Sequence, residues 1–318
     1  MRFAVVGAGA IGGFLAAALA RAGFPVAVVA RGAHRRAIER CGLRVTGDLG
    51  DFTVRLDASD DLRDLGNFDF LLLTFKAHQW PGFGAQLGPY AGTATRLVTM
   101  QNGLPFWYVR EPPLRSVDPQ GAIGRLFPDE QTIGSVVHVS GEILEPGYVR
   151  QSGGLRYVFG DPGGGAGAST DELVSALRSA GLAAESDTDV RQTVWLKLVN
   201  NTGLNAVSAL RGLKIKPMLD DPAARKHVAG LMHEALAVGQ AMGVVGDVDV
   251  EARISYAARL DNVRTSMLQD VEQRRALELD PILGAVCELG ERYGVATPLV
   301  REAYAALQRL SATWKLPV

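Results

Sequence analysis

The chain has 318 residues, 47% of them hydrophobic and 21% charged, and its formal net charge is -1. This composition is ordinary for a globular protein large enough for two domains, and the near-neutral charge gives no electrostatic reason to expect nucleic acid or an anionic membrane as a partner. The two cysteines lie far apart in the sequence and no apolar run reaches about 18 residues, so we expect no disulfide and no membrane span. The first apolar residues run directly into a glycine turn, unlike a signal peptide, so we expect a cytoplasmic protein.

The first 31 residues have the pattern of a strand, a glycine turn, a helix and a second strand. An apolar run ends at residue 6, an alanine-rich helical stretch covers 14–22, and a second apolar run covers 26–30. The turn itself consists of Gly7, Ala8, Gly9, Ala10, Ile11 and Gly12. Glycines at this spacing allow a tight turn, the close approach of a pyrophosphate and close packing of the helix, whose N-terminus favours phosphates. The pattern predicts a dinucleotide-binding loop.

The residue after the second strand indicates which dinucleotide binds. Sites that prefer NAD usually have an acidic residue about 20 positions beyond the glycines, where it bonds to the ribose 2′-hydroxyl. Arg31 stands near that position, and a guanidinium can pair with a 2′-phosphate. We therefore expect NADP(H) as the cofactor. The alternative is that Arg31 is a solvated surface charge, and the contribution of the nearby Arg35 and Arg36 stays open.

Two further apolar runs, 68–75 and 96–100, are typical of buried parallel strands. Lys76 follows the first and Asn102 follows the second closely, and ligands of open α/β sheets bind beyond the carboxyl ends of the strands. We therefore expect both side chains near the cofactor. A proline-marked stretch, 112–128, is predicted to be a loop or an insertion. The short strand-like pieces that follow, 133–139, 147–150 and 155–159, predict an antiparallel addition to the sheet.

From about residue 190 onward, helical periodicity dominates the sequence. The expected helices cover 192–210, 223–242, 250–270, 281–293 and 298–310. The predicted fold class is an α/β Rossmann-type N-terminal domain, with a mostly parallel sheet and an antiparallel addition, followed by an all-α C-terminal domain. We place the cofactor-binding domain at residues 1–188 and the helical, substrate-binding and catalytic domain at residues 189–318.

One predicted helix carries polar residues that a buried helix does not need. Lys197, Asn201 and Asn205 are spaced at i, i+4 and i+8, so they fall along one stripe. Asparagine is a mediocre helix former, and a buried lysine is costly without a partner. Such departures are common at functional sites, which favours a catalytic or binding role. The alternative is that Lys197 reaches solvent while the asparagines bridge to a neighbouring helix.

A second polar group of residues covers 265–270 and 277–280. Glu278 lies between two leucines, just ahead of the helix predicted to begin at Pro281. Its carboxylate could be a partner for Lys197, or it could be a first-turn charge that stabilises the helix dipole. Sequence spacing does not decide between these interpretations.

Taken together, these motifs resemble those of the ketopantoate reductase family, the 2-dehydropantoate 2-reductases of the 6-phosphogluconate-dehydrogenase-like superfamily. The similar pieces occur in the order of the family and span most of the chain: the glycine turn 7–12, LTFKA at 73–77, QNG at 101–103, WLKL at 195–198 with Asn201 and Asn205, SMLQD at 266–270, and ELD at 278–280.

The resemblance implies a role for each matching position. Lys197 corresponds to the catalytic lysine, the general acid that protonates the carbonyl oxygen as hydride arrives at C2, and Glu278 to an acid that interacts with cofactor and substrate beside it. The implied substrate-binding positions are Asn201, Asn205, Ser266 and Asn102, the last of these also near the nicotinamide. The implied cofactor contacts, besides Asn102, Glu278 and the glycine turn, are Arg31, Lys76 and, at a less certain match, Ser140.

The resemblance also implies an activity. We expect an NADPH-dependent oxidoreductase that reduces ketopantoate to pantoate in pantothenate and coenzyme A biosynthesis, with a small 2-oxo acid as substrate and no metal ion. The bulky residues 104–108 and the long 112–128 stretch depart from the best-known members, so another 2-oxo acid, branched-chain or aryl, stays open as the substrate. A non-catalytic NADP-binding sensor is the third alternative, and the sequence leaves a homodimer open.

Overall fold

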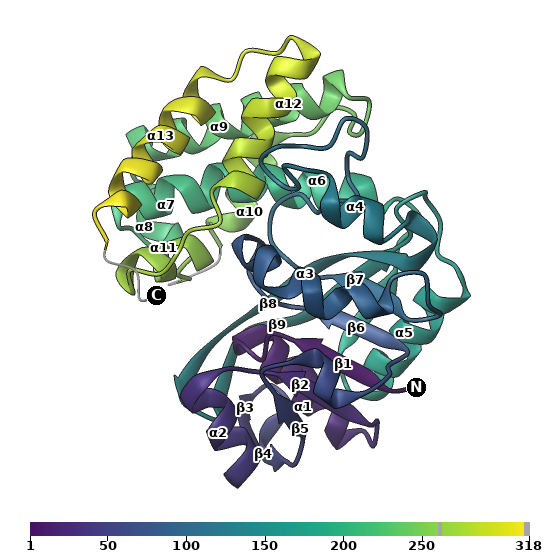
Figure 1. Ribbon diagram of the computed structural model, residues 1–318. Helices are drawn as coiled ribbons and strands as arrows, with labels where there is room; N and C mark the ends of the chain where they lie inside the picture. The colour runs from purple at the N-terminus through teal and green to yellow at the C-terminus, as the bar shows by residue number, and fades with distance from the viewer. Residues whose placement is uncertain (260–262, 315–318) are drawn as a thin grey trace. The chain divides into compact units, whose positions relative to one another are not determined.

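The computed structural model describes residues 1–259 and 263–314 (Figure 1). The chain divides into two compact units. An α/β unit consists of Met1–Gln101 and Gly121–Val190, and a helical unit consists of Asn102–Gln120 and Arg191–Val318. Among the residues that the structure describes, none of the helices is long and apolar enough to cross a membrane.

The α/β unit is built on one large sheet. Six strands lie in the order β5-β2-β1-β6-β7-β8 and each pairs in parallel with its neighbour. The four-residue strands in the middle are buried along their whole length, as expected for parallel strands covered on both faces. The bounds of these strands are β1 Phe3–Val6, β2 Val26–Val29, β5 Asp57–Ser59, β6 Phe70–Leu73, β7 Arg96–Thr99 and β8 Thr132–Glu145.

The expected antiparallel addition begins where β8 leaves β7. The 14 residues of β8 pair with β7 in parallel over their first part and with β9 (Tyr148–Gly160) antiparallel over nearly their whole length. The two short strands expected at 147–150 and 155–159 are thus one continuous strand. The sheet continues from β9 to β3 (Leu43–Gly47) and β4 (Gly50–Val54), and β10 (Ala183–Ser186) also pairs with β9. The predicted fold class is confirmed.

The first helix, α1 (Ala10–Arg21), lies inside the curl of this sheet. It contacts strands from both parts of the sheet: β1, β2, β3, β4, β8 and β9. Every residue from Gly12 to Leu19 is buried, which explains why the helix is apolar on all sides rather than along one stripe. The other helices of this unit are α2 (Gly32–Cys41), α3 (Trp80–Leu87), α4 (Ala122–Leu126) and α5 (Ala168–Ser179) (Figure 1).

The helical unit packs its elements around a core that includes Trp195, Leu198, Val228, Leu231 and Leu283, each at most 1% exposed. Its α-helices are α6 Val190–Asn200, α7 Ala206–Arg211, α8 Ile215–Asp220, α9 Pro222–Ala241, α10 Val250–Ala257, α11 Ser266–Glu272, α12 Ala285–Tyr293 and α13 Pro298–Ala312.

Three of the helices predicted from periodicity differ in the structure. The helix expected at 192–210 is interrupted by a π-helical turn, η5 (Asn201–Asn205), and the helix expected at 281–293 begins with another, η6 (Asp280–Gly284). The helix expected at 250–270 is two helices, because the Thr265 hydroxyl accepts a hydrogen bond from the Leu268 N–H and thereby caps a new helix, α11. Residues 260–262 of that expected helix lie outside the described residues.

Residues 102–120 group with the helical unit, which the boundary placed at 188/189 from the sequence does not anticipate. The Leu104 N–H donates to the Pro281 carbonyl (2.7 Å), and the Tyr108 ring stacks on Trp195 at 5.9 Å between centroids. The Glu288 carboxylate accepts hydrogen bonds from the backbone N–H groups of Arg115 and Ser116, each at 3.0 Å. Local sequence patterns do not predict these contacts, because they join residues more than 80 positions apart.

Candidate active site

The glycine loop connects β1 to α1 with little free space around two of its glycines. Gly7 has φ +106°, and a Cβ on it would lie 2.8 Å from the Phe75 nitrogen. A Cβ on Gly12 would lie 2.3 Å from the Gly7 carbonyl oxygen and from the Thr74 hydroxyl, which donates to that carbonyl (2.7 Å). Both positions therefore require glycine: Gly7 for its backbone angle and Gly12 because helix and strand approach so closely.

Gly9 differs from the other two, because a Cβ there would meet no described atom within 4 Å. It is the N-terminal cap of α1, and within the described residues neither a capping side chain nor an acidic first-turn residue neutralises this helix end. The N–H groups of a helix's first turn lack partners inside the helix and carry the positive end of the helix dipole. Open space beside Gly9 and a bare helix N-terminus fit a dinucleotide pyrophosphate.

Arg31 and Lys76 lie beyond the carboxyl ends of the strands on either side of β1. Arg31 follows β2 and is exposed, and its guanidinium lies over the Phe83 ring at 4.8 Å from the centroid. Phe83 in turn stacks on Phe75 at 4.4 Å. Because β2 and β6 both pair with β1, Arg31 and Lys76 both follow strands that end at the side of the sheet where the glycine loop lies.

Ser140, a further predicted cofactor contact, lies in the same unit, as do Arg35 and Arg36, whose contribution the sequence leaves open. Arg35 forms ion pairs with Glu39 (3.8 Å) and Asp60 (3.3 Å), whereas Arg36 is exposed. Ser140 is an exposed residue of β8, and a Cβ on its neighbour Gly141 would lie 3.6 Å from the Ala10 Cβ. This strand therefore passes the glycine loop near Ser140.

In the helical unit, the two predicted catalytic residues, Lys197 and Glu278, form a continuous hydrogen-bonded chain through Asn102. The Lys197 ammonium donates to the Asn102 side-chain carbonyl (3.0 Å), and the Asn102 amide donates to the Glu278 carboxylate (3.3 Å). These residues come from α6, from the 102–120 segment and from the turn ahead of η6, and they are up to 176 positions apart. The sequence interpretations of Lys197 as a solvent-reaching lysine and of Glu278 as a simple dipole charge do not describe this arrangement.

Burial changes the acidity of the lysine in this chain. Removal from water lowers the pKa of Lys197 from 10.5 to about 8, and the negative charge of Glu278 opposes the shift by favouring the ammonium. The group is therefore mostly charged at neutral pH but titrates close to it, which suits a proton donor. Its Asn102 partner fixes the direction in which one ammonium hydrogen points and adds no charge of its own.

The asparagines of the polar stripe lie in η5, the π-helical turn. In a regular α-helix each step of four residues overshoots a full turn by about 40°, so Asn205 would rotate away from Lys197. A π-helical turn contains more residues per turn and reverses this drift. Asn205 is 8% exposed, and the amide nitrogen of Asn201 is buried with no hydrogen-bond partner in the described part of the chain. Such an unpaired buried donor is unusual and available to a ligand.

Ser266 is the first residue of α11 and is exposed. Its helix contacts η5 and α7, the latter through a hydrogen bond from the Thr265 hydroxyl to Ser208 (3.1 Å). η5 also contacts η6, which begins two residues after Glu278. The helical unit therefore brings the elements that carry Ser266, the two asparagines and Glu278 next to one another.

Sequence reasoning gave no role to Gly103, which holds Asn102 in place. Gly103 has φ +82°, and a Cβ on it would lie 2.4 Å from the Pro281 carbonyl oxygen. This close approach lets the next N–H, that of Leu104, donate to the same carbonyl. The Gln101-Asn102-Gly103 motif already contains this glycine, but the requirement for glycine comes from the long-range contact with Pro281.

The bulky residues after Gly103 have a structural explanation. Phe106, Trp107 and Tyr108 are all at most 3% exposed. The Tyr108 hydroxyl donates to the Arg191 carbonyl (2.8 Å), and the Arg191 guanidinium donates to the Tyr108 carbonyl (2.7 Å). These side chains therefore pack inside the helical unit, so their bulk gives no evidence of an aromatic substrate.

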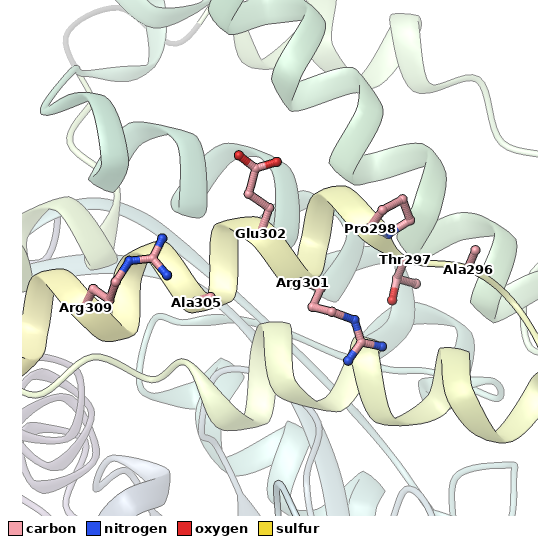
Figure 2. A pocket seen from close by; sticks show the side chains of 7 residues that line it. All are labelled: Ala296, Thr297, Pro298, Arg301, Glu302, Ala305 and Arg309. Carbon is pink, nitrogen blue, oxygen red and sulfur yellow. The ribbon is translucent and has the colours of Figure 1, made fainter.

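A surface hollow on α13 includes none of these residues in its lining. Figure 2 shows its lining, which comes from α13 and the residues just ahead of it: Ala296, Thr297, Pro298, Arg301, Glu302, Ala305 and Arg309. Arg301 is paired with Glu291 (2.9 Å), and Glu234 accepts hydrogen bonds from the first-turn N–H groups of Leu299 and Val300. The charge of Arg301 is thus already compensated by a carboxylate. Among the described residues, no group of three or more His, Cys, Asp or Glu could hold a metal ion.

Known proteins resemble the chain along nearly its whole length. The family model of the ketopantoate reductases PanE/ApbA matches residues 3–164, and the model of the C-terminal part of the same family matches residues 189–311. The 2-dehydropantoate 2-reductase of Mesorhizobium japonicum is 37% identical over 98% of both chains. The family consists of nicotinamide-dependent oxidoreductases.

Solved structures of the same family superimpose closely. A protein of Ralstonia solanacearum MolK2 assigned to the ketopantoate reductases has a TM-score of 0.93 and 34% identity over 99% of each chain. The 2-dehydropantoate 2-reductase of Geobacter metallireducens GS-15 has a TM-score of 0.87 and 29% identity over 97% of this chain and 99% of its own. With both family models matched and a relative of this identity, the chain belongs to the ketopantoate reductase family of oxidoreductases.

Proposed function

We propose that the protein reduces 2-dehydropantoate to pantoate with NADPH, a step of pantothenate and coenzyme A biosynthesis, and that Lys197 is the general acid. The observation that carries this proposal is the chain Lys197–Asn102–Glu278, in which a half-buried ammonium with a pKa of about 8 is aligned by an amide. The names of the relatives, 2-dehydropantoate 2-reductase, support the choice of substrate.

The chemistry requires a proton donor beside the ketone. A nicotinamide bound through the glycine loop supplies a hydride to C2 of the substrate. As the carbonyl π bond breaks, its electron pair places negative charge on the oxygen, and an ammonium at hydrogen-bond distance stabilises that charge. Lys197 then gives its proton to this oxygen, which forms the hydroxyl group, and the neutral amine regains a proton from solvent.

The polar residues around Lys197 suit the rest of this substrate. A 2-oxo acid with a hydroxyl group offers carboxylate, carbonyl and hydroxyl oxygens. The amides of Asn201 and Asn205 and the hydroxyl of Ser266 can donate to such oxygens without adding a charge. The unpaired buried amide nitrogen of Asn201 gives direct support, because a substrate oxygen would satisfy it.

For NADPH over NADH, the support comes from Arg31. The exposed guanidinium follows the strand that ends beside the glycine loop, and no acidic residue lies in the first turn of α2 in the described structure. A 2′-phosphate accepts charge-assisted hydrogen bonds from a guanidinium, which are about twice as strong as neutral ones. Stacking on Phe83 keeps the guanidinium plane fixed for this purpose.

A substrate panel tests the proposal. The oxidation of NADPH, followed by its absorbance, is measured with purified protein and ketopantoate, 2-oxoisovalerate or pyruvate, and then repeated with NADH. We expect the highest kcat/KM for ketopantoate with NADPH. A higher kcat/KM for another acid would contradict the choice of substrate, and no turnover on any acid despite tight NADPH binding would contradict the enzymatic proposal and favour a sensor.

A further inference from the structure

Arg253, on α10, holds the helix turn that carries Lys197. Its Nε donates to the Asn200 side-chain carbonyl (3.1 Å) and its Nη2 donates to the Leu196 backbone carbonyl (3.1 Å). Leu196 directly precedes Lys197, and Asn200 directly precedes Asn201. One edge of a single guanidinium therefore donates hydrogen bonds to the last turn of α6 on both sides of Lys197.

The turn that follows lacks strong stabilisation of its own. η5 has the sequence Asn-Thr-Gly-Leu-Asn, in which only leucine is a good helix former. The Thr202 hydroxyl and the Asn201 amide nitrogen are buried and have no hydrogen-bond partner within the described residues. π-helical turns are rare, and the side chains of η5 contribute little to its stability. Hydrogen bonds from another helix to the end of α6 therefore have a direct effect on the position of η5.

The guanidinium is used for its geometry rather than for its charge. Arg253 is partly buried, which lowers its pKa, and it forms no ion pair among the described residues. Both acceptors are neutral carbonyl groups, so the cost of desolvating a cation is not offset by a carboxylate. What arginine adds at this position is two parallel N–H donors in a rigid plane, which lysine lacks.

We propose that Arg253 is a positioning residue for the reductase reaction, whose two-point grip on Leu196 and Asn200 sets the direction in which Lys197 and Asn201 face the substrate. This inference rests on the proposed function. It assigns a role outside the site itself, since Arg253 reaches the substrate only through the helix that it holds.

Three variants test this role. Arg253→Met keeps the length of the apolar stem but removes both donors, whereas Arg253→Lys keeps the charge and removes the fork. The matched control is Arg225→Met, because Arg225 on α9 binds Glu251 and Ser255 of the same α10 helix, and none of its hydrogen bonds or ion pairs in the described part of the chain involves α6. Each variant is measured for Tm, NADPH Kd, kcat and KM for ketopantoate, and the pH dependence of kcat.

We expect both Arg253 variants to lower kcat about 10- to 100-fold, the range for a misplaced catalytic group, with NADPH Kd unchanged within about twofold. The alkaline limb of their kcat–pH profiles should move to higher pH. A less constrained turn exposes Lys197 to water, which raises its pKa, while Glu278 remains its charged neighbour. Arg225→Met should keep the wild-type kcat and pH profile. Wild-type kcat and pH profile in Arg253→Met, or full activity in Arg253→Lys, would overturn the proposal.

A second measurement does not depend on the substrate. An amine-reactive reagent modifies Lys197 at a rate that mass spectrometry can follow over a range of pH. This rate reports the pKa and the exposure of the Lys197 amine directly. We expect the modification profile of Arg253→Met and Arg253→Lys to shift to higher pH relative to wild type and Arg225→Met. If the wild type failed to reduce ketopantoate, the proposed function would fail, but an unchanged profile in the Arg253 variants would still refute the positioning role.

Discussion

The acidity of Lys197 arises from an imbalance between two effects on one ammonium group. Burial favours the neutral amine, and the carboxylate of Glu278 favours the charged form without cancelling the effect of burial. Asn102 links the two groups, since it accepts a hydrogen bond from the ammonium through its oxygen and donates one to the carboxylate through its nitrogen. Because the effect of burial exceeds the attraction of Glu278, the pKa of the lysine stays low enough for its proton to be transferred.

The proposed preference for NADPH over NADH also depends on one residue, Arg31. Arg31→Ala removes the guanidinium that we assign to the 2′-phosphate, a loss of charge-assisted hydrogen bonds of about 1.5–3 kcal/mol. We expect KM for NADPH to rise about 10- to 100-fold while KM for NADH changes little. Steady-state kinetics with both cofactors measure this. Arg36→Ala is the control, because Arg36 is an exposed arginine of the neighbouring helix α2.

An equal rise of KM for both cofactors in Arg31→Ala would show that Arg31 does not read the 2′-phosphate. An effect in Arg36→Ala as large as that in Arg31→Ala would mean that general positive charge, rather than this position, sets the preference.

At the scale of elements, the π-helical turn η5 separates what the sequence could predict from what it could not. The i, i+4, i+8 stripe singled out Lys197, Asn201 and Asn205, because polar residues in an apolar helix are visible in any sequence. The widening of the helix at Asn201–Asn205 was not visible, since hydrophobic periodicity cannot separate a regular helix from one with a single wide turn.

The short connection that carries Asn102 depends on its glycine. Gly103→Ala places a Cβ within 2.4 Å of the Pro281 carbonyl oxygen at a backbone angle that disfavours other residues. We expect a loss of about 2–4 kcal/mol in the free energy of unfolding, together with a fall in kcat because Asn102 moves away from Lys197. Denaturant unfolding and steady-state kinetics measure the two effects.

Gly243→Ala is the matched control for this substitution. Gly243 has φ +70° and also follows a helix in the helical unit, but a Cβ on it would meet no described atom within 4 Å. We expect it to cost only about 1 kcal/mol and to leave kcat unchanged. Equal effects of the two substitutions on stability and on kcat would contradict the role assigned to the Gly103–Pro281 contact.

At the scale of the whole molecule, the fold class and the glycine loop could be predicted because they depend on local signals: apolar strands, a glycine turn and helical periodicity. The grouping of residues 102–120 with the helical unit could not, because it depends on contacts such as Tyr108 with Trp195 and Arg115 with Glu288. The same limit applies to the site, where the sequence supplied the residues and the structure supplied the chain from Lys197 to Glu278.

This grouping has a consequence for fragments of the chain. A fragment of residues 189–318 would expose the face of Trp195 that Tyr108 covers, and Glu288 would keep only Arg292 of its described hydrogen-bond donors. Burial alone raises the pKa of Glu288, but these hydrogen bonds outweigh it and lower the pKa, so their loss leaves a poorly compensated carboxylate. We expect the fragment to unfold at lower temperature than the full chain and without cooperativity.

Circular dichroism during heating measures the unfolding temperature and the cooperativity of the 189–318 fragment and of the full chain. The control is a fusion in which residues 102–120 are joined to residues 189–318 by a flexible glycine-serine linker, which should recover cooperative unfolding. Cooperative unfolding of the fragment alone, at the temperature of the fusion, would mean that residues 102–120 are dispensable for the fold of the helical unit.

The pH dependence of ketopantoate reduction, measured for the wild type and for Lys197→Ala at saturating NADPH, tests the central claim most directly. Because the acid must be the ammonium, kcat should be constant at neutral pH and fall as pH rises through about 8. Lys197→Ala should lower kcat about 100- to 10,000-fold, lack this limb, and bind NADPH as the wild type does. A wild-type kcat that stays constant from pH 7 to well above pH 8, or substantial activity of Lys197→Ala with the alkaline limb retained, would contradict the assignment of Lys197 as the general acid.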